Sequence, residues 1–426
     1  MHYTTQGQLW QIRQELAYWK KNTPKYRYNT YRYRSASVTE VIASLYNSID
    51  SSDPNVAKAL ALIPEIYGSG TPDSSTNDPS RREKHFESLK EALIVAQQID
   101  KSKEKAEVLI RIAHAYIKLS DSTQDPTVLK QALTVAQQID KSKDKGETLI
   151  EIAQAYIKLS DSTQAVAVLK QALTVAQQIN NSYSKVEVLK EIAQAYIKLS
   201  DSTQDSTVLK QALTVAQQID DSPSKVWILI EIAEAYIKLS DSTQAVAVLK
   251  QALTVAQEID SFYFQTGILN EIAEAYIKLS ESTQDPTFLK QALTVAQQIN
   301  NSRSKGETLI EIAEAYIKLS DSTQDPTLLK QSLIPAEQID DSEDKVEILT
   351  KIAQGYIKLS DSKEALTIFK QALNVIQDSH SLFPKTEQQT AIVIEMAETQ
   401  AKLQRWGDAL LSLIHISEPT RPISIS

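Results

Sequence analysis

Histidine is the first residue type to examine for catalysis or metal binding, because imidazole serves as a general base and as a metal ligand near neutral pH. The chain has five histidines, and they are scattered along it: His2, His85, His114, His380 and His415. No two have a metal-ligand spacing, and no His-Glu-x-x-His occurs. The sequence also lacks cysteine, a Gly-x-Ser-x-Gly turn and a Walker phosphate loop. We therefore expect no catalysis, no metal and no cofactor.

Basic and aromatic residues interleave in one segment near the N-terminus, residues 20–34, which reads KKNTPKYRYNTYRYR. This combination can bind single-stranded nucleic acid or an anionic membrane. The net charge of the whole chain is −9, however, and phosphate binding needs a basic surface. We therefore expect this segment to be a surface strand or a disordered arm, and nucleic acid not to be the main partner.

Two further features concern location. No stretch approaches the ~18–20 consecutive apolar residues of a membrane span. The first residues, MHYTTQ, are polar and lack the apolar core of a signal peptide. The expected location is the cytoplasm, with no membrane span.

A repeat of 40 residues determines the secondary-structure elements that would position any functional site. The string YIKLS occurs seven times without one insertion, beginning at Tyr116, Tyr156, Tyr196, Tyr236, Tyr276, Tyr316 and Tyr356. The string KQALTVAQ follows at the same period through most of this region. Self-similarity at a fixed period is the signature of a repeat architecture.

Each unit has the pattern of two helices. Over residues 145–160 the apolar side chains fall on one face of a helix: Leu149, Ile152, Ala153, Tyr156 and Leu159. A second stripe follows the polar connector: Leu169, Ala172, Leu173, Ala176 and Ile179. Two helices cannot cover both apolar stripes, so neighbouring units must stack. The expected fold is all-α, a right-handed α-solenoid of stacked antiparallel helix pairs.

The connectors predict where the second helices start. Four units place an aspartate there: Asp125, Asp205, Asp285 and Asp325. Three of the four are followed by proline, which suits an N-cap and a first helical residue. The other units have Ala165-Val166, Ala245-Val246 or Ala365-Leu366 instead. In these the second helix is expected to start about three residues earlier, capped by the preceding serine.

The residues resemble the tetratricopeptide repeat family. That family's pattern has a small residue, an aromatic three later, Ala twelve later, a large apolar residue sixteen later and Ala nineteen later. One unit matches every step with Ala153, Tyr156, Ala165, Leu169 and Ala172, and another does so with Ala353, Tyr356, Ala365, Phe369 and Ala372. The units with the connector aspartate match in part. The 40-residue period exceeds the usual 34, so a long-unit variant is expected, with a HEAT-like array as the alternative.

The resemblance implies a groove lined by the first helix of each pair, in which a peptide binds. Carried over to this chain, the expected groove residues are Gln154, Lys158, Gln194, Lys198, Glu234, Lys238, Glu274, Lys278, Glu314 and Lys318. The same positions hold His114 and Lys118 in the first unit, and Gln354 and Lys358 in the last. A lysine ladder would suit an acidic peptide or a C-terminal carboxylate. The alternative interpretation is a solvated face with i,i+4 pairs such as Glu234–Lys238.

One unit departs from the rest. Trp227 replaces the glutamate found at Glu147, Glu187 and Glu307, and residues 261–264, SFYF, are expected to form an aromatic loop. An exposed Trp near aromatic residues can be a binding hot spot, so Trp227 joins the candidate peptide-binding residues. Local packing after sequence drift is the other interpretation.

The ends of the chain are unlike the repeats. We expect a basic, tyrosine-rich segment at 1–54, a degenerate helix and linker at 55–80, the repeat array at 81–410, and a non-native tail at 411–426. The tail resembles the conceptual translation of a transposase-type sequencing adaptor, so the natural protein is expected to be longer. The predicted function is a non-enzymatic scaffold that binds a protein or peptide. The alternative is the sensor or regulatory region of a larger signalling enzyme.

Overall fold

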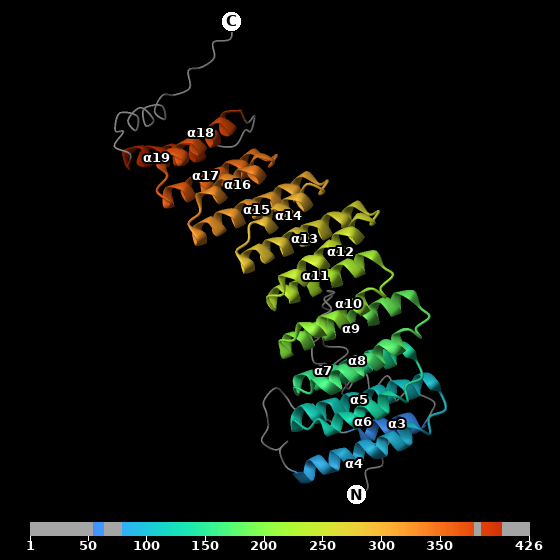
Figure 1. Ribbon diagram of the computed structural model, residues 1–426. Helices are drawn as coiled ribbons and strands as arrows, with labels where there is room; N and C mark the ends of the chain where they lie inside the picture. The colour runs from blue at the N-terminus through green and yellow to red at the C-terminus, as the bar shows by residue number, and fades with distance from the viewer. Residues whose placement is uncertain (1–53, 64–78, 379–384, 403–426) are drawn as a thin grey trace, which may run out of the picture. The chain divides into compact units, whose positions relative to one another are not determined.

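The computed structural model describes residues 54–63, 79–378 and 385–402. Within these residues every secondary-structure element is a helix (Figure 1). The chain divides into two compact units, Met1–Thr203 and Gln204–Ser426, which we call unit 1 and unit 2. In each unit, antiparallel helices pack in pairs and the pairs follow one another in chain order, which confirms the predicted helical-repeat fold.

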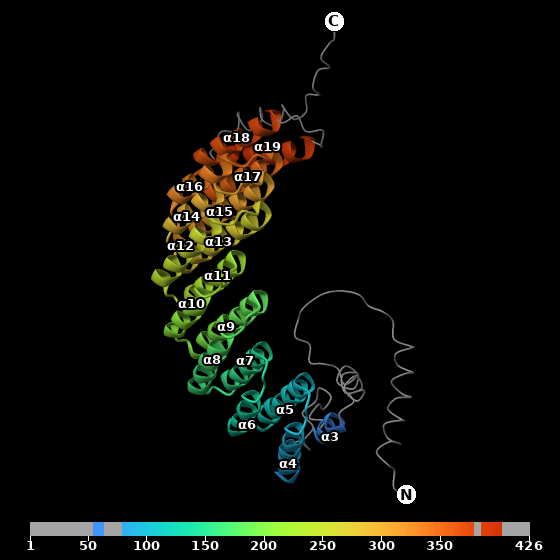
Figure 2. The same cartoon turned by 90° about the vertical axis from the view of Figure 1, so that its right-hand side faces the viewer.

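The helices of unit 1 form the first of these stacks. Among the described residues they are α3 (Pro54–Leu62), α4 (Pro79–Ala96), α5 (Ser102–Thr123), α6 (Thr127–Ala136), α7 (Ser142–Lys158), α8 (Ser162–Ala176) and α9 (Ser182–Thr203). The first helix of each pair packs on the next pair's first helix, so α5, α7 and α9 lie side by side. Figure 2 shows these first helices on one side of the unit and α6 and α8 on the other.

Unit 2 repeats this arrangement. Its described elements are the 3-10 helix η2 (Ser206–Val208), α10 (Leu209–Ala216), α11 (Ser222–Lys238), α12 (Ser242–Gln257), α13 (Phe262–Thr283), α14 (Thr287–Ala296), α15 (Ser302–Thr323), α16 (Pro326–Glu337), α17 (Ser342–Lys358), α18 (Ser362–Asp378) and α19 (Lys385–Lys402). The first helices α11, α13, α15 and α17 lie side by side. The candidate face is built on them.

Two kinds of helix pair share the 40-residue period. In the long-first kind, a 22-residue first helix such as α5 is followed by a short second helix, the 10-residue α6. In the short-first kind, the 17-residue α7 is followed by the 15-residue α8. About one turn of helix is thus moved from the first helix to the second, so the register of the repeat is kept. The first helices of the long-first kind are α5, α9, α13 and α15, and those of the short-first kind are α7, α11 and α17.

The connector residues explain the two kinds. In long-first pairs, the chain reverses at a left-handed glutamine such as Gln124, and the carboxylate of Asp125 accepts the Thr127 backbone N–H at 2.9 Å. In short-first pairs it reverses at a left-handed serine such as Ser160, and the second helix begins at once. The early start was predicted, but the cap is not a serine. Asp161 accepts the Gln164 N–H at 3.1 Å, and carboxylates cap helices well because they also face the positive end of the helix dipole.

The core consists of small and aromatic residues repeated every 40 positions. Ala153 and Ala172 are fully buried, as are their counterparts in the other described pairs, and this lets the helices approach closely. The tyrosine of each YIKLS string is buried beside them. The hydroxyl oxygens of Tyr156 and Tyr236, both in short-first pairs, are buried without a hydrogen-bond partner.

The predicted ends of the array lie partly outside the described residues. α3 overlaps the segment expected to be a degenerate helix, and α4 begins at Pro79, inside the segment expected to be a linker. The basic segment 20–34 and the tail 411–426 fall outside the described residues, so the expectations for them stay predictions.

Candidate peptide-binding face

The polar surface of the first helices carries the residues expected to bind a peptide. In each unit, taken by itself, we call this surface the first-helix face: it lies on α5, α7 and α9 in unit 1, and on α11, α13, α15 and α17 in unit 2. Ile152, Ala153 and Tyr156 of α7 are buried, whereas Gln154 is half-buried and Lys158 is exposed. The same alternation along the other first helices leaves the remaining candidates half-buried or exposed: Gln194, Lys198, Trp227, Glu234, Lys238, Glu274, Lys278, Glu314 and Lys318.

In unit 1 the lysines of this face differ in their surroundings. Lys118 is half-buried, and burial, partly offset by Glu151, lowers its pKa to about 8. Its neighbour His114 places Nε2 2.6 Å from a carboxylate oxygen of Glu151 on α7. Lys158 reaches back to α5, with its Nζ 3.1 Å from Asp121 Oδ2. These contacts join successive first helices through side chains.

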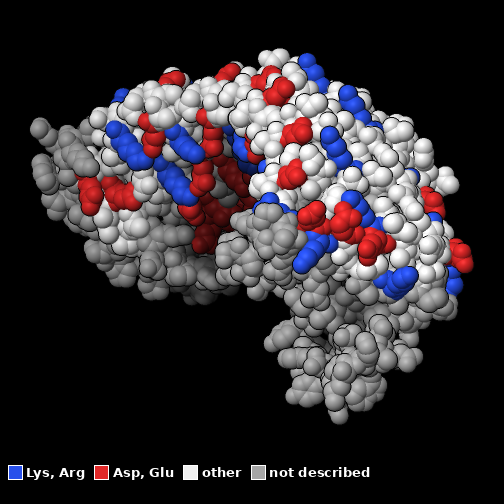
Figure 3. All heavy atoms as spheres, turned by 90° about the horizontal axis from the view of Figure 1, so that it is seen from below, with Lys and Arg blue, Asp and Glu red and all other residues white. Residues whose placement is uncertain are grey.

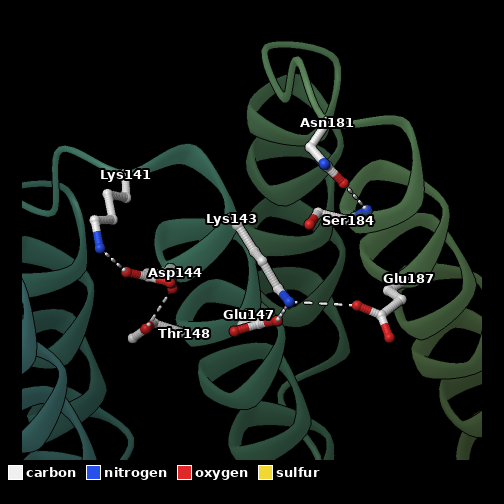
Figure 4. A network of polar contacts seen from close by, with 8 residues as sticks. All are labelled: Lys141, Lys143, Asp144, Glu147, Thr148, Asn181, Ser184 and Glu187. Atoms are coloured by element: carbon white, nitrogen blue, oxygen red, sulfur yellow. Dashed lines mark hydrogen bonds and ion pairs between the residues drawn. The ribbon is translucent and has the colours of Figure 1, made fainter.

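A network around Lys143 joins α7 to α9 (Figure 4). Lys143 Nζ lies 3.3 Å from a Glu187 carboxylate oxygen and 3.6 Å from one of Glu147. The hydrogen bond to Glu187 is the main cause that raises the pKa of Lys143. Burial raises the pKa of Glu147, against the opposing effect of Lys143. Two glutamates therefore share one cation on this part of unit 1.

In unit 2 the lysines of the ladder are also engaged by carboxylates. Lys278 Nζ lies 2.7 Å from Glu234 of α11 and 2.9 Å from Glu274 of its own helix. Burial acts to lower the pKa of Lys278, but the hydrogen bonds to both glutamates raise it overall. Lys318 lies 2.7 Å from Glu281, and Lys358 lies 2.7 Å from Asp321. An anionic ligand would compete with these carboxylates for the lysines.

Carboxylates without a paired cation lie in the middle of the same face. Glu271 on α13 and Glu311 on α15 have no basic group within 4.0 Å among the residues that the structure describes. Burial, reinforced by nearby glutamates, raises the pKa of both. Figure 3 shows acidic side chains gathered in rows with Lys and Arg beside them. Sequence reasoning did not identify this crowding, because it depends on how neighbouring helices are placed.

The aromatic residues of unit 2 are exposed on α11 and α13. Trp227 is 39% exposed, and Phe262, Tyr263 and Phe264 are exposed as well. The predicted loop at 261–264 is wrong in one respect, because Phe262–Phe264 form the first turn of α13 and Ser261 is its N-cap residue. The residues FYF at 262–264 occupy the same places as the Ser-Lys-Asp and Ser-Arg-Ser starts of α7 and α15, and that alignment could have revealed the helix.

The described residues contain no group of three or more His, Cys, Asp or Glu side chains that could hold a metal ion. None of the helices in the described part is long and apolar enough to cross a membrane.

Two stretches of the chain match the family model described as "Tetratricopeptide repeat", residues 146–179 and 228–259. Each covers most of a short-first pair, α7 with α8 and α11 with α12. These are pairs in which Ala165 and Ala245 supply the small residue that the connector aspartate replaces elsewhere. A search of curated proteins found no match to the chain.

The solved structures that match the chain are distant from it in sequence. A circular tandem repeat protein with novel repeat topology is 13% identical, with 85% of this chain and 96% of that chain covered and a TM-score of 0.44. A Signal Transduction ATPase with Numerous Domains with a tetratricopeptide repeat sensor, from Pyrococcus horikoshii, is 13% identical, with 88% and 54% covered and a TM-score of 0.28. The apo form of RapI is 12% identical, with 85% and 97% covered and a TM-score of 0.30.

Proposed function

We propose that this chain, which contains tetratricopeptide repeats, is a non-enzymatic scaffold that binds a peptide or protein segment along the first-helix face. The observation that carries the proposal is the continuity of polar side chains across neighbouring first helices. Glu234 of α11 and Glu274 of α13 share Lys278, and Glu314 of α15 shares Lys351 with Glu347 of α17. A segment that crosses these helices would therefore meet polar groups at each step.

The proposed contacts are the residues that the family resemblance implies. They are Gln154, Lys158, Gln194, Lys198, Trp227, Glu234, Lys238, Glu274, Lys278, Glu314 and Lys318. Four of them, Gln154, Glu234, Glu274 and Glu314, are half-buried, which supports this role, because half-buried polar side chains lose less conformational freedom on binding than fully exposed ones. Beneath them, the buried alanines and tyrosines hold the helices in place. The proposed location of the scaffold is the cytoplasm.

Position-specific photo-crosslinking of the full chain tests this function without assuming the charge of the partner. A photoreactive residue replaces Gln194 or Glu314 on first helices, and Lys170 or Lys290, which are exposed on second helices, in the matched controls. Discrete cross-linked protein bands from the first-helix positions alone are expected. Equal bands from both sets, or none from the first-helix set, would contradict the proposal.

The sensor or regulatory region of a larger signalling enzyme stays a second prediction from the sequence. Recovery of a longer reading frame that encodes a catalytic domain would favour it over a free-standing scaffold.

A further inference from the structure

Exposed aromatic side chains are concentrated at one place in unit 2. In the described part of the chain, the exposed large aromatic residues are Tyr183, Trp227, Phe262, Tyr263 and Phe264, and four of these five lie on α11 and α13. The ring centroids of Tyr263 and Phe264 lie 6.0 Å apart in an edge-to-face arrangement. Exposed aromatic groups in one place mark interaction sites, because burial of their surface against a partner is favourable.

Open space beside Gly267, which we call the opening, lies in the same row of the repeat as the Trp227 side chain. Position 227 in the repeat corresponds to position 267, and α11 and α13 pack side by side. Position 267 is glycine, and a Cβ built there has no heavy atom within 4 Å. Phe264 is one turn before Gly267 on the same helical face, and Glu271 is one turn after it. An entering side chain would thus have apolar surface on one side and a carboxylate on the other.

The charges around this opening select a cationic occupant. Glu234 and Glu274 share the single ammonium group of Lys278, so two carboxylates face one cation there. Glu271 and Glu311 have no basic partner within 4.0 Å in the described part of the chain. A cation placed among these carboxylates would relieve their mutual repulsion.

We propose that the face of α11, α13 and α15 binds an arginine-containing segment of a partner protein, with a guanidinium group stacked on Trp227 beside Gly267 and paired with Glu271. Arginine fits better than lysine, because its planar guanidinium stacks on aromatic rings and pairs with carboxylates through two hydrogen bonds. This proposal rests on the proposed scaffold function and specifies the chemistry of the partner. It also replaces the acidic peptide expected from the lysine ladder with a basic one at this part of the face.

The test uses the full chain and three fluorescein-labelled twelve-residue peptides that alternate serine with arginine, lysine or glutamate. Fluorescence anisotropy is expected to rank their affinities as arginine, then lysine, then glutamate. Trp227→Glu restores the residue found at Glu147 and Glu187, so it adds a negative charge while it removes the indole. It is expected to weaken the binding of the arginine peptide about tenfold.

Gly267→Glu fills the opening and also adds a negative charge, so the same weakening is expected. Gly306→Glu is the matched control, because a Cβ at Gly306 also meets no heavy atom within 4 Å, and the added charge is the same. It is expected to leave the affinity within about twofold of the parent chain. Circular dichroism melts of each variant confirm that the helices are retained.

Simple attraction between opposite charges predicts tighter binding by Trp227→Glu and Gly267→Glu, which is the reverse of our expectation. Unchanged or tighter binding by these variants would overturn the proposal, as would a glutamate peptide that binds as well as the arginine peptide. If the arginine peptide fails to bind while first-helix crosslinks persist, the partner chemistry is wrong and the scaffold function stands. If both fail, the scaffold function falls as well.

Discussion

The face of α7 and α9 and the face of α11 and α13 are built on the same repeat, yet they satisfy their polar groups differently. In unit 1, Glu147 and Glu187 occupy one row and Lys143 binds both. In unit 2 the same row holds Trp227 and Gly267, and Pro223 takes the place of Lys143, whereas Tyr263 matches Tyr183 of α9. Three substitutions at matched positions thus replace two glutamates and the lysine they share with an indole, a glycine and a proline. A glutamate without a basic group within 4.0 Å among the described residues lies on both faces, Glu191 on α9 and Glu271 on α13. The scaffold beneath is the same in both.

The largest effect tests whether the two regions share one kind of core. Ile152 and Ile272 occupy the same repeat position and are fully buried. Ile152→Ala and Ile272→Ala should each lower the free energy of unfolding by ~2–5 kcal/mol, because each leaves a cavity among fixed helices. Differential scanning calorimetry measures the loss. Losses that differ by more than about twofold would show that the cores are not equivalent.

Removal of a tyrosine hydroxyl that has no hydrogen-bond partner should change stability less, and in the opposite direction. Tyr156 of unit 1 and Tyr236 of unit 2 each bury a hydroxyl oxygen without a partner. Tyr156→Phe and Tyr236→Phe should therefore leave the protein as stable as before or raise its stability by up to ~1 kcal/mol, since a buried polar group without a bond is removed. A loss of stability in urea unfolding would mean that the hydroxyl has a partner in solution.

Substitution of alanine for glycine should change stability by different amounts in the two regions. Gly267→Ala, in open space, should stabilise α13 by ~0.5–1 kcal/mol, since alanine loses less backbone freedom in a helix. Gly146→Ala in unit 1 should gain less, because its Cβ would meet Val188 Cγ1 at 3.1 Å. The two melting temperatures are the measurement. Equal gains would show that Val188 moves aside easily.

The smallest effect concerns pH. Burial, with the charges of Glu274 and Glu234, raises the pKa of Glu271, so the folded state holds this proton more tightly than the unfolded one. The resulting stability is complete below the unfolded pKa of about 4.3 and is lost as the pH rises through the higher folded pKa.

Glu271→Gln should therefore raise stability at pH 7 by a few tenths of a kcal/mol and have no effect near pH 4. Thermal melts at both pH values, with Glu337→Gln on α16 as control, measure the difference. A gain at pH 4 equal to that at pH 7 would assign the effect to something other than ionisation.

The sequence predicts the repeat and the helix pairs well, because both depend on patterns within one helix. The predicted first helix 145–160 is Ser142–Lys158 in the structure, and buried residues such as Ile152 and Tyr156 were identified. The cap at Asp161 was missed, because Ser160, Asp161 and Ser162 are all capping residues and only the left-handed turn at Ser160 selects among them. Periodicity carries no information about that turn.

The candidate face was harder to predict, since its ion pairs join helices that lie far apart in sequence. The spacing Glu274–Lys278 within one helix predicts a pair, and that pair is present. Lys278 also reaches Glu234, 44 positions earlier, and Lys318 reaches Glu281, 37 positions earlier. Which carboxylate a lysine binds depends on the stagger between adjacent first helices, and no pattern along the chain specifies that stagger. The lysine ladder as a site for an acidic ligand stays a prediction.

Both kinds of helix pair begin and end at the same positions of the 40-residue repeat. They differ in where the left-handed residue lies: Ser160 corresponds to position 120, and Gln124 lies four residues later. Among the described pairs a long-first pair is followed by either kind, since α13 precedes the long α15 and α15 precedes the short α17. Duplication or excision of a 40-residue segment would therefore keep the register of the repeat. A gene built in this way can lengthen or shorten its product in whole steps while single positions, such as 227 and 267, diversify freely.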